Sequence, residues 1–455
     1  MKVLLISTNQ LRPSEAQSWI PVVPLGLAYV AAALRQAGHR VHLLDLCFEK
    51  EQERCVAGAI SGFQPDVIGI SFRNLEMMAY FRNVSFLGDL LAVVGICRSE
   101  SDAVVILGGS GFSLMPEEIL NYTGAPMGVV GEGEWAMPEV LSKLESGDDV
   151  RLVAGLVLRD GERTGQRSQG YGTDLAFLPT PARDLIDHAR YTRAGGTANV
   201  QSKRGCPFGC IYCTYPVIEG RHVRCRPPEQ VAEEFGLLAG DLNVRDVYVV
   251  DSQFNSSLDH AKQVCEQLIA RRKKAGFRWT CMLNPGRVDD ELVLMLRLAG
   301  CTMVDLGVDA GSDHMLEKLG KGFSVGDVEN TLRLLRRNGL AFNTWMLLGG
   351  PGETEETVRQ TVDFAVKNQI SSVLFSIGIR ICPRTKLEDL ACREGRIGNG
   401  DSLLEPVFYL SLDADSIVDL VRPYCRGRTG WHIAALPHPD EMHRECGTSK
   451  VPDSP

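Results

Sequence analysis

Three cysteines stand close together in the chain, at Cys206, Cys210 and Cys213, within the sequence GCPFGCIYC. A short loop with the spacing C-x3-C-x2-C can place three thiolates around one iron–sulfur cluster, because thiolates are the usual protein ligands of such clusters. A [4Fe–4S] cluster needs one ligand more than this loop supplies, so one iron keeps an open position. An open metal position indicates chemistry at the metal rather than a purely structural site.

Two other interpretations of these cysteines stay open at this point. A zinc site would need a fourth ligand, and His222 and Cys225 lie close enough in the sequence to be considered. Alternatively, the three thiols are free cysteines that lie together by chance. The segments that follow the loop favour the cluster.

The elements around the cysteine loop alternate between strand and helix. The pattern predicts strands ending near residues 204, 250, 283, 309, 348 and 379, with helices over 228–239, 258–274, 289–299, 324–338 and 354–368. Such alternation predicts a partial (β/α)6 barrel, whose working face is the carboxyl end of its strands. The cysteine loop follows the first strand and should lie on that face.

The N-terminal part alternates in the same way and predicts a separate α/β domain, a doubly wound (flavodoxin-like) parallel sheet. Expected strands cover 2–7, 41–45, 67–71, 104–107 and 128–130, and expected helices cover 25–37, 52–61, 84–97, 116–121 and 134–145. Glycine-rich loops, 108–111 and 131–134, follow two successive strands. Glycine at these strand ends allows the backbone to approach a large ligand closely.

The connecting and C-terminal segments are less regular. Residues 153–159 with the charged turn 160–162 suggest a hairpin, and the proline-rich run 178–184 suggests a stiff linker. Residues 416–422 suggest a helix, and the chain is expected to fray from His438 onward. We therefore expect four parts: a first domain at 1–148, a connector at 149–194, the barrel at 195–395 and an extension at 396–455.

Composition narrows the class of protein. The net charge of −9, without a Lys/Arg-rich run, gives no sign of nucleic-acid binding. No apolar run reaches the roughly 18 residues of a membrane span, and the short apolar start reads as a strand rather than a signal peptide. Fourteen cysteines without export signals predict a reducing, cytoplasmic location. Three of them lie in apolar periodic stretches and are expected in the core: Cys265, Cys281 and Cys301.

The cysteine loop, with an aromatic residue before its last cysteine, resembles the radical S-adenosylmethionine (SAM) superfamily. Preceded by this N-terminal domain, it resembles the cobalamin-dependent radical SAM enzymes of the class B methyltransferase type. The matching stretches are PLGLAY (24–29), DVIGIS (66–71), ILGG (106–109), VGEGE (130–134), DSQFN (251–255), GVDAGS (307–312), GGPGET (349–354) and PRTKL (383–387). The plain reading of 349–354 is a turn followed by a helix cap at Thr354.

The resemblance implies three cofactors: a [4Fe–4S] cluster, SAM and cobalamin. It implies a cluster held by the three cysteines and SAM contacts from Tyr212, Asp251, Ser252, Asp309 and Arg380. For cobalamin it implies contacts from Leu25, Gly26, Ser71, Arg73, Gly108, Gly109, Ser110, Gly131 and Glu132. Two features depart from the pattern. Asp309 stands where relatives have glutamate, and residues 1–38 contain no histidine that could bind cobalt from below.

Arg73 follows the third strand by two residues. In relatives of the tryptophan C-methylase type an arginine fills the space below cobalt, and arginine has no lone pair to offer a metal. The resemblance thus implies that Arg73 excludes a lower ligand. The alternative is a surface arginine paired with Glu76, and Tyr212 likewise has the alternative of ordinary core packing.

The function implied by the resemblance is methylation of an unactivated carbon in a small-molecule or peptide substrate, in natural-product biosynthesis. A low-potential electron donor such as flavodoxin or ferredoxin is the implied partner, with no nucleic acid and no membrane. Cyclisation or rearrangement with the same cofactors is the alternative. A non-catalytic cobalamin module is a third hypothesis, which the open iron position argues against.

Overall fold

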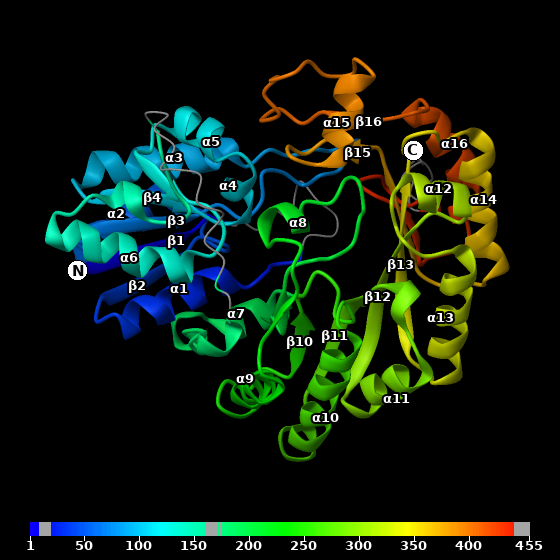
Figure 1. The fold of residues 1–455 in the computed structure, drawn as a ribbon, viewed down its shortest axis with the longest axis horizontal. Helices are drawn as coiled ribbons and strands as arrows, with labels where there is room; N and C mark the ends of the chain where they lie inside the picture. The colour runs from blue at the N-terminus through cyan, green and yellow to red at the C-terminus, as the bar shows by residue number, and fades with distance from the viewer. Residues whose placement is uncertain (9–19, 160–171, 173, 441–455) are drawn as a thin grey trace, which may run out of the picture.

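The computed structural model describes residues 1–8, 20–159, 172 and 174–440, arranged as two α/β domains side by side (Figure 1). The charged turn at 160–162 and the end of the chain from residue 441 lie outside the described residues. No helix in the described part is long and apolar enough to cross a membrane.

The first domain is a doubly wound sheet, as the strand–helix alternation predicts. Its strand order is β2-β1-β3-β4-β5-β6, and only β6 runs antiparallel. The strands are β1 Lys2–Ser7, β2 Arg40–Asp45, β3 Val67–Ser71, β4 Val104–Gly108, β5 Met127–Val129 and β6 Leu156–Leu158. The helices are α1 Leu25–Gln36, α2 Gln52–Phe63, α3 Leu87–Glu100, α4 Ser110–Leu114, α5 Pro116–Thr123 and α6 Gly133–Ser146.

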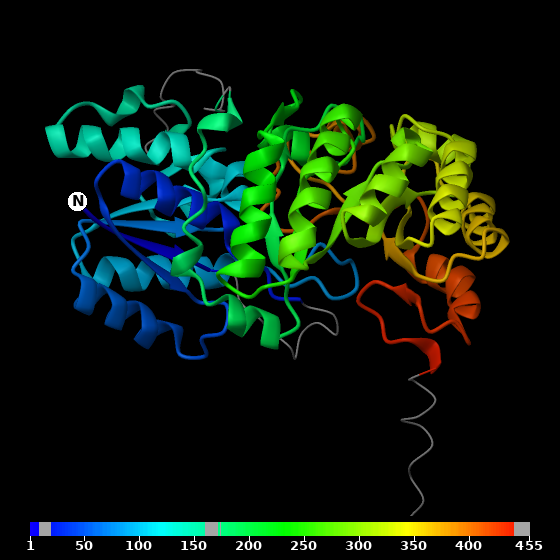
Figure 2. The same ribbon diagram turned by 90° about the horizontal axis from the view of Figure 1, so that it is seen from below.

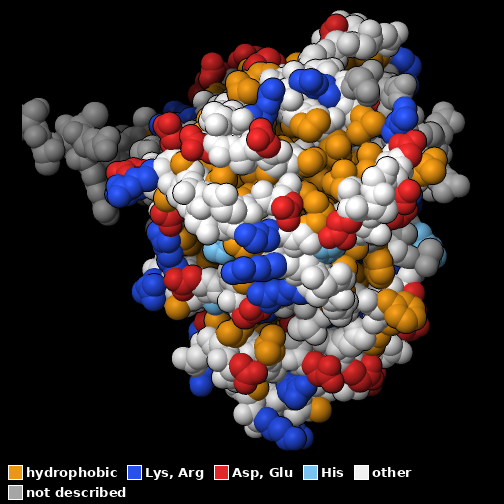
Figure 3. Space-filling model, turned by 90° about the vertical axis from the view of Figure 1, so that its left-hand side faces the viewer, with side chains coloured by type: hydrophobic (Ala, Val, Ile, Leu, Met, Phe, Trp, Pro, Cys, Tyr) orange, Lys and Arg blue, Asp and Glu red, His pale blue; other side chains and the backbone are white. Residues whose placement is uncertain are grey.

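Helices cover both faces of this sheet, as Figure 2 shows. Val3 and Leu5 of β1 pack with α1 and α6, whereas Leu4 and Ile6 pack with α2 and α3. A strand buried on both faces needs a continuous apolar run, which explains the sequence VLLI. The face of this domain in Figure 3 carries acidic and basic side chains intermixed.

The second domain is an open barrel of parallel strands in the order β17-β14-β13-β12-β11-β10-β7. The strands are β7 Ala198–Val200, β10 Asp246–Val249, β11 Arg278–Leu283, β12 Cys301–Asp309, β13 Ala341–Leu348, β14 Val373–Ile377 and β17 Trp431–Ile433. The helices outside them are α9 Pro228–Gly240, α10 Leu258–Ala275, α11 Asp290–Leu298, α13 Val325–Arg337, α14 Glu355–Lys367 and α16 Ala414–Cys425.

Strand β17 is absent from the pattern that the sequence predicts. Three residues are too few for a periodic signal, so tertiary packing places them. Trp431 is buried, and its indole Nε1 donates to the Ile370 carbonyl at 2.8 Å. The C-terminal extension therefore closes one edge of the barrel sheet.

Shorter elements connect the two domains. Residues 156–158 pair antiparallel with β5, and the rest of the expected hairpin lies outside the described residues. Two small antiparallel sheets join β8 Lys203–Arg204 to β9 Arg224–Cys225, and β15 Ile379–Arg380 to β16 Phe408–Tyr409. The remaining helices are α7 His188–Arg193, α8 Tyr215–Ile218, α12 Asp313–Lys318, α15 Lys386–Arg393 and the one-turn helices Val150–Leu152, Leu175–Phe177, Arg183–Leu185 and Pro285–Arg287.

Candidate functional site

A cavity of about 530 Å³ lies where the strand ends of the first domain face the second. Parallel strands bind ligands at their carboxyl ends, so the topology itself places the cavity here. Its opposite wall comes from the segment directly after the cysteine loop, Thr214, Tyr215, Ile218 and Glu219. The first-domain wall includes every residue that the sequence predicts for cobalamin: Leu25, Gly26, Ser71, Arg73, Gly108, Gly109, Ser110, Gly131 and Glu132.

Glycines shape the first-domain wall. Gly109 has φ +97°, and a side chain there would come within 2.6 Å of the Phe72 carbonyl oxygen, so the two loops pack backbone to backbone. At Gly26, by contrast, a Cβ would meet nothing within 4 Å. The wall is thus compact behind and open in front, as a large flat ligand such as a corrin ring requires.

Arg73 faces this cavity. The carbonyl of Arg73 accepts a hydrogen bond from Ser110 Oγ at 2.8 Å, which ties its loop to the glycine loop. The guanidinium has no ion pair among the described residues, and desolvation lowers its pKa. Glu76 instead pairs with Arg380. The alternative of an Arg73–Glu76 surface pair is therefore wrong.

The cysteine loop is clamped by backbone contacts. The amide of Cys206 donates to the Gly220 carbonyl at 3.0 Å, and that of Ile211 to the Leu319 carbonyl at 3.0 Å. A side chain at Gly205 (φ +88°) would collide with the His222 carbonyl oxygen at 2.1 Å. These contacts hold the three thiols on the barrel's strand-end face, where the sequence predicts them.

The three thiols of the loop are the candidate ligands of a cluster, and they lie in a buried environment. Burial raises their pKa, to about 12 for Cys213, and the charges of Cys206 and Cys210 raise it further. Cluster assembly must therefore displace protons from three neighbouring thiols. Cys225 lies on β9 beside Lys203, and the His222 side chain is exposed. Within the described chain no His, Cys, Asp and Glu side chains are grouped to hold a single metal ion.

Tyr212 and Asp309 meet beside the loop. The Tyr212 hydroxyl donates to the Asp309 carboxylate, whose Oδ2 also lies 2.7 Å from Lys321 Nζ. All three side chains are largely enclosed, and Asp309 has φ +69°, which turns its carboxylate toward the loop. Lys321 was not predicted, although its position between Gly320 and Gly322 marks a turn. Its ammonium group places a positive charge near Cys210 and Cys213.

The Lys321–Asp309 pair supports a stability prediction. Lys321→Met should destabilise the fold by about 3–5 kcal/mol, because it leaves a buried carboxylate without its partner. The double variant Lys321→Met/Asp309→Asn should recover much of that loss. Urea unfolding of the wild type, both single variants and the double variant measures the coupling. Additive effects would contradict a direct ion pair.

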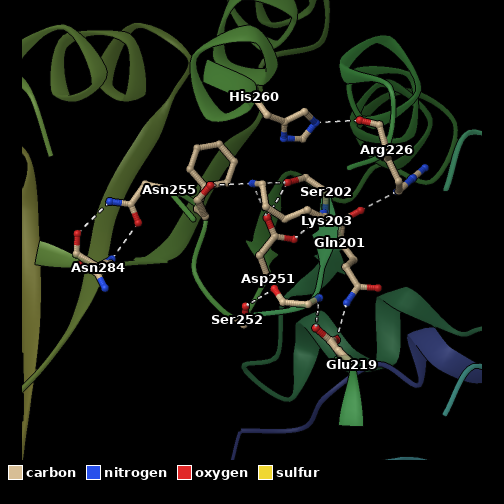
Figure 4. A network of polar contacts seen from close by, with 12 residues as sticks. Gln201, Ser202, Lys203, Glu219, Arg226, Asp251, Ser252, Asn255, His260 and Asn284 are labelled. Atoms are coloured by element: carbon tan, nitrogen blue, oxygen red, sulfur yellow. Dashed lines mark hydrogen bonds and ion pairs between the residues drawn. The ribbon is translucent and has the colours of Figure 1, made fainter. Parts of the chain in front are cut away.

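Asp251 lies under the start of the loop, where Figure 4 shows it turned toward Ser202 and Lys203. Its carboxylate accepts from the Ser202 amide at 2.7 Å and pairs with Lys203 Nζ at 3.0 Å. The side chain is fully buried, which leaves no surface for a cofactor. The arrangement therefore makes Asp251 a support for the loop rather than the predicted SAM contact. Ser252 Oγ donates to the Gly205 carbonyl at 3.2 Å.

Arg380 and Glu132 connect the domains. Arg380 pairs with Glu76 and donates to the Leu403 carbonyl at 2.6 Å, with its side chain 1% exposed. Three of the five guanidinium N–H groups have partners here, the third acceptor being the Ile381 carbonyl, and the SAM contact of Arg380 stays a prediction. Glu132 pairs with Arg224 at 2.7 Å and Arg204 at 3.2 Å while also lining the cavity.

Residues 349–354 form a turn followed by a helix cap, as the sequence suggests. Thr354 caps α14 in a reciprocal capping box with Thr357. Glu353 accepts from the amides of Gly349 and Gly350, and burial raises its pKa to about 7. The GGPGET stretch thus builds a rigid strand-to-helix turn.

Two further cavity residues escaped the sequence reasoning. Tyr215 is 41% exposed, toward the cavity that it lines. Glu219 accepts from the Gly205 amide at 3.0 Å, and desolvation raises its pKa to about 7. Their position directly after the last cysteine was the signal that could have identified them.

Family comparisons agree with this geometry. Residues 21–141 match the B12 binding domain model, and residues 200–365 match the radical SAM superfamily model. Tryptophan 2-C-methyltransferase from Streptomyces laurentii is 27% identical over 443 residues, covering 84% of this chain and 73% of that protein.

Solved structures give the same result. The radical SAM methyltransferase TsrM from Kitasatospora setae, with cobalamin and a [4Fe–4S] cluster bound, superposes with a TM-score of 0.77 at 28% identity, covering 86% of this chain and 75% of that one. The cobalamin-dependent SAM radical enzyme OxsB shares the fold, with a TM-score of 0.75 at 17% identity over 93% of this chain and 66% of that one.

Proposed function

The chain belongs to the cobalamin-dependent radical SAM enzymes of the methyltransferase type, and from this premise we propose that it methylates an unactivated carbon of a small-molecule or peptide substrate. The observation that carries the proposal is the shared cavity. Its two walls are the glycine loops of the B12-type domain and the segment after the cysteine loop. This juxtaposition lets a methyl donor and a radical source act on the same carbon of a bound substrate.

The chain's own residues would do the positioning. Cys206, Cys210 and Cys213 would hold the cluster, and the loops carrying Gly26, Ser71 and 108–110 would hold the corrin. When bound, these cofactors supply a transferable methyl group and a carbon radical. Tyr212 and Asp309, locked together beside the loop, would orient SAM. The connected salt bridges around Glu132 would keep the domains together and water out.

Anaerobic reconstitution with iron, sulfide, hydroxocobalamin and SAM tests this function. We expect release of S-adenosylhomocysteine and 5′-deoxyadenosine, together with a product heavier by one CH2 group when host extract is supplied. Mass spectrometry detects all three. Formation of 5′-deoxyadenosine without S-adenosylhomocysteine would instead favour cyclisation or rearrangement.

We also propose that residues 1–148 bind cobalamin, that residues 195–395 bind the cluster and SAM, and that a flavodoxin- or ferredoxin-type donor supplies electrons. The free thiols of the described cysteines suit a reducing cytoplasm. Natural-product biosynthesis is the proposed context.

Arg73 gives this proposal a spectroscopic test. Arginine cannot donate a lone pair to cobalt, whereas histidine can. Arg73→His should therefore introduce nitrogen superhyperfine splitting into the Co(II) resonance spectrum and slow methylation. Arg73→Lys, which also keeps a positive charge, is the matched control and should show no splitting. Unchanged spectra and rates in Arg73→His and Arg73→Ala would place Arg73 away from cobalt.

A further inference from the structure

Arg384 has an unusual backbone conformation for its residue type. Its φ is +61°, in the left-handed region that glycine favours. The turn that carries it joins β15 to α15, drawn in orange in Figure 1. Contacts within the turn hold this conformation, since the Arg384 amide donates to Glu388 Oε2 at 2.6 Å and Thr385 Oγ1 donates to the Cys382 carbonyl at 2.7 Å. A strained conformation that the surrounding contacts maintain points to a role for the side chain that it places.

The Arg384 side chain reaches the first domain. Its Nη2 donates to the Ser113 carbonyl at 2.5 Å and to the Leu114 carbonyl at 3.1 Å, at the end of α4. The last carbonyls of a helix have no partner within the helix, so a guanidinium is a suitable donor for them. Leu114 also lines the cavity. Arg384 therefore joins the barrel to the cavity wall of the first domain.

Ser113 extends this contact to both glycine loops. Its hydroxyl donates to the Gly109 carbonyl at 2.8 Å and accepts from the Gly131 amide at 3.0 Å. The Ser113 side chain is fully buried, and Gly109 and Gly131 both line the cavity. A displacement of Ser113 would therefore move both glycine loops of the cavity wall.

The same turn holds the cysteine loop through its other end. The amide of Leu387 donates to the Ile211 carbonyl at 2.9 Å, and Ile211 lies between Cys210 and Cys213. Leu387 is fully buried and follows Arg384 by only three residues. Residues 384–387 therefore connect the glycine loops to the cysteine loop through one short piece of chain.

We propose that Arg384 is a positioning residue, which fixes the glycine loops relative to the cysteine loop and so sets the separation between cobalamin and the cluster. This assignment rests on the proposed function, because it deepens the roles given to those loops. A methyl donor and a radical source must reach the same carbon, and a displacement of about 1 Å can slow such a reaction about a hundredfold. The two contacts of the guanidinium with α4 oppose such a displacement.

Pulsed electron paramagnetic resonance of the reconstituted full-length enzyme measures this separation, between Co(II) and the reduced cluster. Arg384→Gly removes the guanidinium and also relieves the left-handed backbone, so the unfolding temperature should stay close to that of the wild type. Iron and cobalamin contents should not change. We expect the cobalt–cluster distances to spread over a wider range, and methylated product per 5′-deoxyadenosine to fall about tenfold or more. Arg384→Lys, whose ammonium can still donate to these carbonyls, should recover most of the loss.

Arg336→Ala is the matched control. The Arg336 guanidinium also donates to backbone carbonyls just beyond a helix end, those of Asn368 and Gln369 after α14, but all three residues belong to the barrel. This variant should leave the cobalt–cluster distances unchanged.

Several results would overturn the assignment. Cobalt–cluster distances in Arg384→Gly equal to those of the wild type would refute it, and so would an equal spread of distances in Arg336→Ala. Loss of iron or cobalamin from Arg384→Gly would give Arg384 a structural role instead. If the wild type releases no S-adenosylhomocysteine, the proposed function fails, whereas the distance comparison still decides the role of Arg384.

Discussion

Replacing Cys206, Cys210 and Cys213 together by alanine should remove the iron–sulfur chromophore and all SAM cleavage. The three thiols sit on one loop that backbone contacts clamp, so the triple substitution removes every thiol that this loop supplies. Iron and sulfide analysis, the visible spectrum and 5′-deoxyadenosine release measure the loss. We expect less than one iron per chain, against about four in the wild type.

Cys225→Ala is the matched control for this experiment. Cys225 is a half-buried cysteine close in sequence to the three loop cysteines. It lies outside the loop, on β9, opposite Lys203 of β8 in the antiparallel register. The Cys225→Ala variant should bind a full cluster. A triple variant that still binds about four irons would show that the cluster site lies elsewhere.

Breaking the Glu76–Arg380 pair should give the largest loss of stability among single substitutions at the domain interface. Both side chains are at most 2% exposed, and they join the B12-type domain to the barrel. Glu76→Ala leaves an unpaired buried guanidinium, with an expected cost of about 3–5 kcal/mol. Because the two residues lie between the domains, cobalamin affinity should fall as well. Thermal unfolding and cobalamin titration measure the two effects.

Two controls separate the ion pair from general damage. The double variant Glu76→Met/Arg380→Met replaces both charges by apolar groups and should be more stable than Glu76→Ala. Arg54→Ala, which removes an exposed pair with Glu51, should change stability little. If Glu76→Ala unfolds like the wild type, this contact does not hold the domains together.

Local patterns in the sequence determined much of this protein. The spacing of the cysteines defines the loop, since all three lie within eight consecutive residues, 206–213. Periodic apolar residues predict both sheets because their burial requires a repeating pattern. The helix cap at Thr354 is also local, because its partner Thr357 lies three residues later, in the first turn of α14. The residues lining the cavity follow from topology, which brings successive strand ends together.

Only the tertiary structure decided which partners the buried charged side chains have. The carboxylate of Asp251, predicted to contact SAM, is filled by contacts from Ser202 and Lys203. Arg380 forms a buried pair with Glu76. Glu76 and Arg380 are separated by 304 residues, so no spacing rule could pair them. Ion pairing and exposure arise from packing between distant segments, whereas loops, caps and strands arise from residues that are neighbours in the chain.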